Sequence, residues 1–204
     1  MAFHKISQQN LPVALVGAGL PSLPTQLREA KPYAERLFSY HQLGRLAEPA
    51  ARKALVLPAE REGVTYEPEA VTLILERSDG YPYFIQDYGR VVWSEAGSSP
   101  ITLADVEEAA SIVQEDLDQE FFDNRVEEAT AGERRYMAAM AKLGDGPQKT
   151  SDVSDALGFK SQSSGSRVRL DLIKKGLIYS PGHGRVDFTV PHFADFMRRR
   201  YPLP

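Results

Sequence analysis

The sequence predicts a mainly α-helical fold, with a bundle of helices in the middle of the chain and a β-hairpin near its end. Two observations lead to this prediction. From about residue 48 onward, apolar residues recur at helical spacing, and prolines or capping residues stand where each run begins. Over residues 177–190, two short apolar runs flank a turn rich in glycine and proline, which is typical of a hairpin.

The start of the chain has a different pattern. Residues 2–9 favour one or two helical turns, residues 13–16 an apolar strand, and residues 35–40 a second strand. Gly17 and Gly19 follow the first strand, and many phosphate-binding sites begin in this way. The chain lacks the lysine of a P-loop and the third glycine of a dinucleotide site, and two prolines remove amides from the loop. We therefore interpret the two glycines as a strand end and a turn.

Four consecutive helical patterns predict a small bundle in the middle of the chain. Pro49, Pro68 and Pro82 each stand where a first helical residue is expected, and Thr102 with Asp105 forms a variant of the capping box. The apolar side chains expected in the bundle core are Ala70, Leu73, Ile74, Phe84, Ile85, Tyr88, Val91, Val92, Val106, Ala109, Val113, Leu117 and Phe121.

The last third of the chain predicts further helices and the hairpin. Thr130 and Glu133 form a full capping box that starts a helix ending at Leu143, and Thr150 or Ser151 caps a short helix. The other expected elements are a loop over 144–148, a helix over 164–175, strands over 177–179 and 186–190, and a last helix over 192–200.

The composition restricts the classes of function. Cysteine is absent, which excludes disulfides, thiol nucleophiles and cysteine-type zinc sites, and the four histidines lack the spacing of metal ligands. Neighbouring carboxylates fit solvated helix faces, so we expect no enzyme active site. Because the first residues do not resemble a signal peptide and no apolar run is long enough to cross a membrane, we expect a cytoplasmic protein with no membrane partner.

Charge is divided unevenly along the chain. Residues 131–204 carry 13 Lys and Arg against 7 Asp and Glu, a net charge of +6, whereas residues 1–130 carry a net charge of −10. Such a division indicates modules with different partners, and the C-terminal module is the candidate for binding an anionic ligand.

A helix, a short helix, a glycine-containing turn, a second helix and a hairpin are the layout of a winged helix-turn-helix. The helix over 164–175 would then be the recognition helix, Gly176 its left-handed end, and residues 181–184 the tip of the wing. A solvated helix face or a protein-binding winged helix would carry the same residue types, and the arginines at 198–200 fit either phosphate contacts or a helix C-terminus. The side chains expected to contact DNA are Lys160, Ser163, Ser166, Arg167, Arg169, Lys174, His183 and Arg185.

Four stretches together resemble the C-terminal part of a bacterial AAA+ family of ATPases, which is similar to the archaeal-type ATPases and the origin-recognition initiators. The stretches are LPVALVGAGLPSLP, AERLFSY, SDGYPYFIQDYGRVVW and KKGLIYSPGHGRVDFTVPHFADFMRRRYP. The resemblance covers nearly the whole chain and implies three domains. They are a remnant of an α/β ATPase core with the sensor-1 strand over 1–46, a helical lid-like bundle over 47–129, and a winged helix domain over 130–204.

The same resemblance implies a role for the nucleotide site. The P-loop and the Walker B carboxylates would lie upstream of this sequence, so the chain resembles a truncated family member that has no cofactor of its own, whereas the intact family uses ATP and magnesium. Arg36 matches the usual place of an arginine finger; its alternative is a surface arginine paired with Glu35 or another acid. Tyr83 stands where the sensor-2 arginine is expected and cannot supply its charge. Tyr81 and Tyr83 fit either stacking near adenine or packing within the lid.

Two functions follow as expectations. In the first, the chain is the C-terminal fragment of an AAA+ ATPase whose winged helix binds double-stranded DNA. In the second, the winged helix contacts the lid or a partner protein and reports the nucleotide state. The expected partners are therefore duplex DNA, the missing ATPase core or another protein, and a second copy of the chain paired through the strand at residues 13–16, because an unpaired strand edge favours association.

Overall fold

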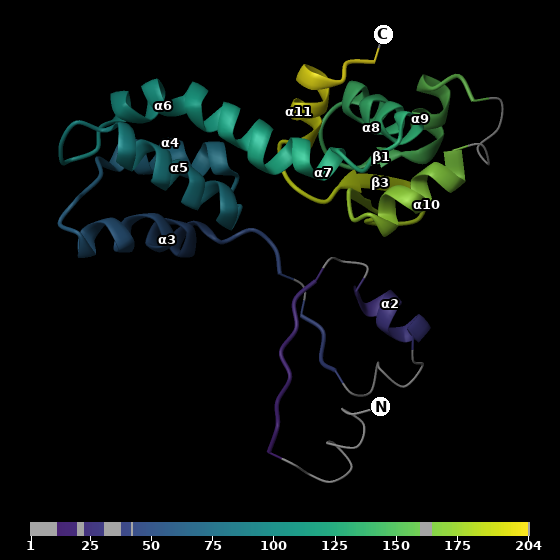
Figure 1. Ribbon diagram of the computed structural model, residues 1–204, viewed down its shortest axis with the longest axis horizontal. Coiled ribbons are helices and arrows are strands. Elements are labelled where there is room, and N and C mark those ends of the chain that lie inside the picture. Colours follow the sequence, from purple (N-terminus) through teal and green to yellow (C-terminus); the bar gives the residue numbers. More distant parts are fainter. Residues whose placement is uncertain (1–11, 20–22, 31–37, 42, 160–164, 204) are drawn as a thin grey trace.

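The computed structural model describes residues 12–19, 23–30, 38–41, 43–159 and 165–203. These residues form a mainly helical protein, as the sequence predicts, and they include one small three-stranded sheet. Figure 1 shows two groups of helices, joined by a long helical run along one side.

The first group is the expected bundle, in which α3, α4, α5 and α6 pack against one another. A proline stands in the first turn of α3, α4 and α5, where its missing amide has no helical partner in any case. Thr102 and Asp105 close the capping box that starts α6. The predicted core positions are buried or partly buried, and Val71 and Ser78 are buried with them. The helices are α3 (Glu48–Arg61), α4 (Pro68–Ser78), α5 (Pro82–Glu95) and α6 (Leu103–Asp116).

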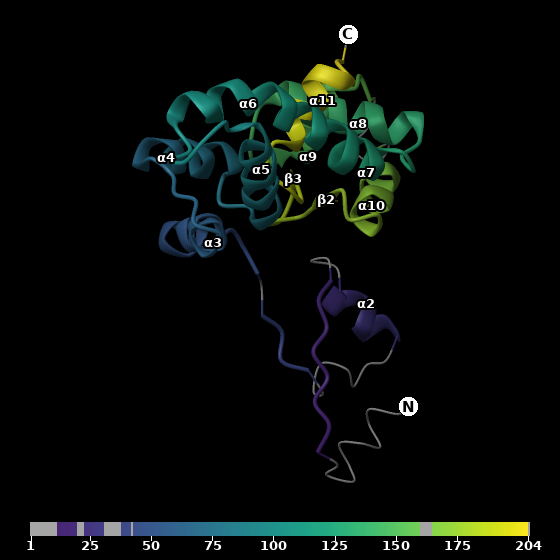
Figure 2. The ribbon, with the colours of Figure 1, turned by 60° about the vertical axis from the view of Figure 1, so that its left-hand side comes forward.

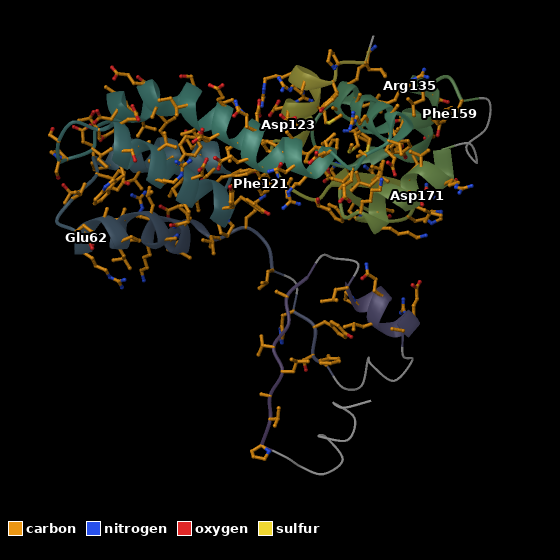
Figure 3. All side chains as sticks on the ribbon, viewed as in Figure 1. Glu62, Phe121, Asp123, Arg135, Phe159 and Asp171 are labelled. Carbon is orange, nitrogen blue, oxygen red and sulfur yellow. The ribbon has the colours of Figure 1, made fainter. Side chains whose placement is uncertain are left out.

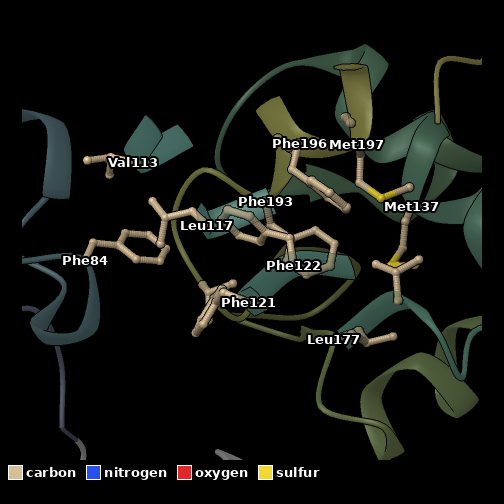
Figure 4. Packing of buried hydrophobic residues seen from close by; sticks show 14 of the residues in the cluster. Phe84, Val113, Leu117, Phe121, Phe122, Met137, Leu177, Phe193, Phe196 and Met197 are labelled. Carbon is tan, nitrogen blue, oxygen red and sulfur yellow. The ribbon is translucent and has the colours of Figure 1, made fainter. Parts of the chain in front are cut away.

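A π-helical segment, η2 (Leu117–Asp123), continues α6 and leads into the short helix α7 (Asn124–Val126). It turns two consecutive rings, Phe121 and Phe122, into the interior. In Figure 4 these rings lie between Phe84 of the bundle and Phe196 of the second group of helices. The two groups therefore share one continuous apolar core across the π-helical segment.

The second group contains the predicted helices and hairpin, together with a strand that the sequence analysis missed. Gln148 was expected in a loop but pairs with Val186, and Ile178 pairs with Phe188, so the antiparallel sheet has the order β1-β3-β2. The elements are α8 (Ala131–Leu143), β1 (Gln148–Lys149), α9 (Thr150–Ala156), α10 (Ser166–Lys174), β2 (Ile178–Tyr179), β3 (Arg185–Phe188) and α11 (Phe193–Arg200).

Of the two helix caps predicted in this group, one is confirmed and the other is wrong. Thr130 and Glu133 form the predicted capping box of α8. The predicted cap of α9 is wrong, because Lys149 holds the capping position without a side-chain hydrogen bond and Thr150 is already helical. The Thr150 amide instead donates to the Gly184 carbonyl, at 2.9 Å, which ties the start of α9 to the hairpin.

The start of the chain differs most from the prediction. Residues 12–19 form no strand and are exposed, and residues 38–40 form none either. Residues 23–30, for which the sequence predicts no helix or strand, form the helix α2 (Leu23–Ala30). The predicted helical turns at 2–9 and most of the strand at 35–40 lie outside the described residues. A strand needs a partner for its backbone groups, and the described chain offers none to residues 13–16.

Candidate nucleic-acid interface

Helix α10 is anchored through its inner face. Leu172 is fully buried, and α10 packs on α8 and β2. Gly165, just before the helix, is so close to Tyr136 and Phe159 that a Cβ added there would stand 3.4 Å from an atom of each ring. Gly176 follows the helix at φ 70°, in the left-handed region that the sequence predicts for this position. Figures 1 and 2 show α10 at the edge of the second group of helices, with one side facing outward.

The outward side of α10 carries one line of exposed residues. Successive residues of a helix are about 100° apart, so positions three and four apart share a face. Arg167, Leu170 and Lys174 follow this spacing, and all three are exposed. In the described part of the chain, neither Arg167 nor Lys174 makes an ion pair. The one acid of α10, Asp171, is half-buried (Figure 3).

Arg169 departs from the predicted interface. Two positions along a helix correspond to about 200°, so Arg169 lies on the opposite flank from Arg167. It is half-buried, and its charge lowers the pKa of Tyr136 against the larger effect of burial, which raises that pKa. Arg167 and Arg169, both expected to contact DNA, therefore lie on different sides of α10.

The remaining predicted residues of the recognition helix are divided. Lys160 and Ser163 lie outside the described residues. Ser166 is half-buried and already has an interaction of its own. Leu170 was not predicted, although counting helical positions outward from Leu172 would have placed it near the middle of the exposed face. Contact with DNA stays a prediction for all of these residues.

The tip of the hairpin is exposed and is stabilised by hydrogen bonds within the turn. The Ser180 hydroxyl lies 2.9 Å from the Gly182 carbonyl oxygen and 3.0 Å from the Arg185 carbonyl oxygen. Arg185 is exposed, and its guanidinium donates to the Pro147 carbonyl at 3.3 Å, next to β1. His183 is exposed at the tip. The structure thus presents both predicted wing residues to solvent on an ordered turn.

Lys175, which follows Lys174 directly, has a structural role. Its ammonium group donates to the Glu133 carboxylate at 2.8 Å and to the Glu128 carbonyl at 2.8 Å. Glu133 is only 4% exposed and also accepts from the Thr130 amide. Burial by itself would raise the pKa of Glu133, but the bonds from Lys175 and Thr130 hold that pKa below its ordinary value.

The three arginines at the end of α11 are all engaged within the chain. Arg198 contacts Asp145 at 2.8 Å and Asp195 at 2.5 Å, and it donates to the Ala141 carbonyl. Arg199 and Arg200 pair with Asp118 and Asp123 of η2, at 2.7 Å and 3.5 Å. Neither interpretation of the sequence, phosphate contact or interaction with the helix terminus, anticipated these pairings.

The two tyrosines predicted as remnants of a nucleotide site lie at the junction of the two groups of helices. Tyr83 is 43% exposed and stacks on Phe121, with ring centroids 4.8 Å apart. Tyr81 contacts Phe84 at 4.8 Å and Phe121 at 6.1 Å. Arg36 lies outside the described residues. Both tyrosines thus contact rings of the protein itself, and stacking on a nucleotide stays a prediction.

In the part of the chain that the structure describes, a hollow between α3 and α4 offers no free arginine for an anionic ligand. An open hollow of ≈ 460 Å³ lies between α3 and α4, but its arginines already have partners: Arg45 pairs with Asp79, and Arg52 with Glu48 at 2.9 Å. Among the described residues, no three His, Asp or Glu side chains are grouped to hold a metal ion. The helices described here include none with the length and apolar character needed to cross a membrane.

Comparison with known families adds one finding. A family model described as a domain of unknown function (DUF8462) matches residues 119–197. The match runs from the π-helical segment to α11 and covers well under half of the chain. It begins before α8, so it includes Phe121 and Phe122 together with the second group of helices. No curated protein matches the chain.

Proposed function

We propose that residues 131–200 form a winged helix that binds double-stranded DNA through α10 and the hairpin tip. The order α8-β1-α9-α10-β2-β3 and the sheet order β1-β3-β2 support this proposal, because a winged helix has a recognition helix followed by a two-stranded wing. The observation that carries it is the exposed line on α10. Arg167 and Lys174 there have no ion pair within the described chain, whereas Lys175 and the arginines of α11 do.

We further propose that the bundle α3–α6 corresponds to the lid of an AAA+ ATPase, as the sequence resemblance implies. A four-helix unit that opens α5 with Gly80, Tyr81 and Pro82 supports this assignment. ATP and magnesium belong, in that family, to the P-loop core. The proposal therefore gives this chain a DNA-binding role and no catalytic step of its own.

A salt series tests DNA binding directly. Fluorescence anisotropy of the whole chain with a 20-base-pair duplex of random sequence should show binding at about 50 mM salt. The logarithm of the affinity should then fall linearly with the logarithm of salt concentration, because each phosphate contact releases a counterion. An absence of binding at about 50 mM salt, the lowest concentration of the series and therefore the one with the strongest nonspecific binding, would contradict the proposal.

The junction of the two groups of helices favours a second candidate, a regulatory module. Tyr83 at the start of α5 stacks on Phe121, and the neighbouring ring, Phe122, stacks on Phe196 of α11 at 5.1 Å. Two ion pairs, Arg199–Asp118 and Arg200–Asp123, connect α11 to the same segment. A displacement at the start of α5 would thus reach α11 through direct contacts.

Amide exchange in two matched variants tests this coupling. Tyr83→Ala removes the ring that stacks on Phe121 and should increase exchange in α11. Trp93→Ala changes a similarly exposed aromatic residue of α5, but one near the opposite end of the helix, and should leave α11 unchanged. If Tyr83→Ala affects exchange only within α5, the bundle does not communicate with α11 by this route.

A further inference from the structure

Leu170 is an apolar side chain on the face of α10 that is otherwise polar or basic. It is 52% exposed and does not belong to the apolar core. Arg167 precedes it by three residues and Lys174 follows it by four, so both lie one turn away on the same exposed line. Since Leu172 anchors the inner face, Leu170 is free to contact whatever α10 meets.

The chemistry of the major groove supplies a matching group. A helix in that groove meets base edges along its central line and phosphates along its flanks. Thymine alone presents an apolar group there, the C5-methyl, and apolar side chains discriminate thymine through it. A leucine between two cations one turn away on either side therefore combines a contact for a methyl group with contacts for phosphates or guanine.

We propose that Leu170 contacts the C5-methyl of a thymine and gives this interface a preference for thymine-containing duplex DNA. The inference rests on the proposed DNA-binding function. The cations on the same face favour a polyanion over an apolar protein groove as the occupant. Duplex RNA would be a poor ligand, because its deep, narrow major groove does not admit side chains.

The test compares two duplexes that differ only in methyl groups. One is a 20-base-pair duplex of mixed A and T sequence, and the other replaces every thymidine with deoxyuridine. The whole chain should bind the thymine duplex about fourfold more tightly, which is the expected contribution of one buried methyl group. Both affinities are measured by fluorescence anisotropy at about 50 mM salt.

Substitutions test whether Leu170 causes the preference for the thymine duplex. Leu170→Ala should reduce the ratio of the two affinities to about one, and Leu170→Gln, which keeps the length of the side chain, should do the same. Leu57→Ala changes a comparably exposed leucine on α3 and should leave the ratio unchanged. Arg167→Ala should weaken binding to both duplexes alike, because a phosphate contact does not read the methyl group.

The outcomes separate this inference from the function on which it rests. Binding to both duplexes with equal affinity would overturn the thymine contact and leave the DNA-binding proposal standing. A preference for thymine that survives Leu170→Ala would overturn it as well, and would assign the preference to other residues. If neither duplex binds at about 50 mM salt, both proposals fail, and α10 becomes a protein-contacting face.

Discussion

Helices α10 and α11 both carry clustered cations, yet the structure uses them in opposite ways. On α11, Arg198, Arg199 and Arg200 all pair with acids, which lie in the loop between α8 and β1, in η2 or in α11 itself. On α10, Arg167 and Lys174 face outward, and within the described chain they pair with no acid. The helix with three consecutive arginines, α11, thus uses them in contacts within the protein.

The difference teaches that pairing, more than the local density of charge, distinguishes a binding surface from a structural contact. A cation that already has a carboxylate partner must lose it before it can contact a phosphate, whereas an exposed cation only exchanges water and counterions. Lys174 and Lys175 repeat this contrast in adjacent positions, since only Lys175 reaches the buried Glu133.

The largest expected effect concerns stability. Phe196 of α11 is fully buried and stacks on Phe122, so Phe196→Ala should lower the free energy of unfolding by about 3–5 kcal/mol. Leu170→Ala on α10 should change it by no more than about 0.5 kcal/mol, because that side chain is largely exposed. Urea denaturation measures both, and similar losses would contradict the distinction between the buried side chain of α11 and the exposed face of α10.

The second effect concerns binding to DNA. Arg167→Ala combined with Lys174→Ala should weaken binding to random duplex about tenfold to a hundredfold near 0.1 M salt, and should reduce the slope of the salt dependence by about two. Arg199→Ala combined with Arg200→Ala removes the same number of cations from α11 and should leave the slope unchanged. Equal slopes for the two double variants would show that net charge, rather than pairing, governs the interface.

The third effect depends on pH. Lys175→Met leaves the buried Glu133 without its cation and should cost about 1–2 kcal/mol at pH 7. Because the folded pKa of Glu133 lies below its unfolded value, its contribution is present above the unfolded pKa and is lost as the pH falls through the folded one. The difference in unfolding free energy between Lys175→Met and the unaltered protein should therefore become smaller in acid. Lys174→Met is the control, and urea denaturation should show almost no change at any pH.

The smallest effect concerns one surface ion pair. Arg199 and Asp118 are partly exposed, so their coupling should be about 0.2–1 kcal/mol and should shrink at high salt. A double-mutant cycle with Arg199→Ala and Asp118→Ala measures this coupling from unfolding free energies. A coupling that does not respond to salt would mean that the pair is shielded from solvent and contributes more to the junction than its exposure indicates.

The sequence predicted the helices well where the signal is local. Pro68 and Pro82 begin α4 and α5, and the capping boxes of Thr102 and Thr130 begin α6 and α8, because each acts on the first turn that follows it. The strand expected at residues 13–16 failed for the complementary reason. A continuous apolar run is compatible with a strand but forms one only beside a partner.

The candidate interface follows only in part from the sequence. Arg167 and Lys174 on α10 and His183 and Arg185 at the hairpin tip are exposed, whereas Arg169, expected to act with them, is half-buried on another side of α10. The spacing of Arg167 and Arg169, two positions in the sequence at 3.6 residues per turn, already places these two arginines on different sides of a helix. Strand β1 was not predicted, because a two-residue strand has no periodicity to detect. Only its pairing with β3 identifies it.

The sequence by itself determined the order and type of most helices, the hairpin and the division of charge, since caps, prolines and apolar spacing act within a few residues. Only the tertiary structure decided which charges remain available. Arg199 meets Asp118 across 81 positions and Lys175 meets Glu133 across 42. The first contact depends on how the π-helical segment meets α11, and the second on how α10 packs against α8. No local pattern in the chain encodes either arrangement.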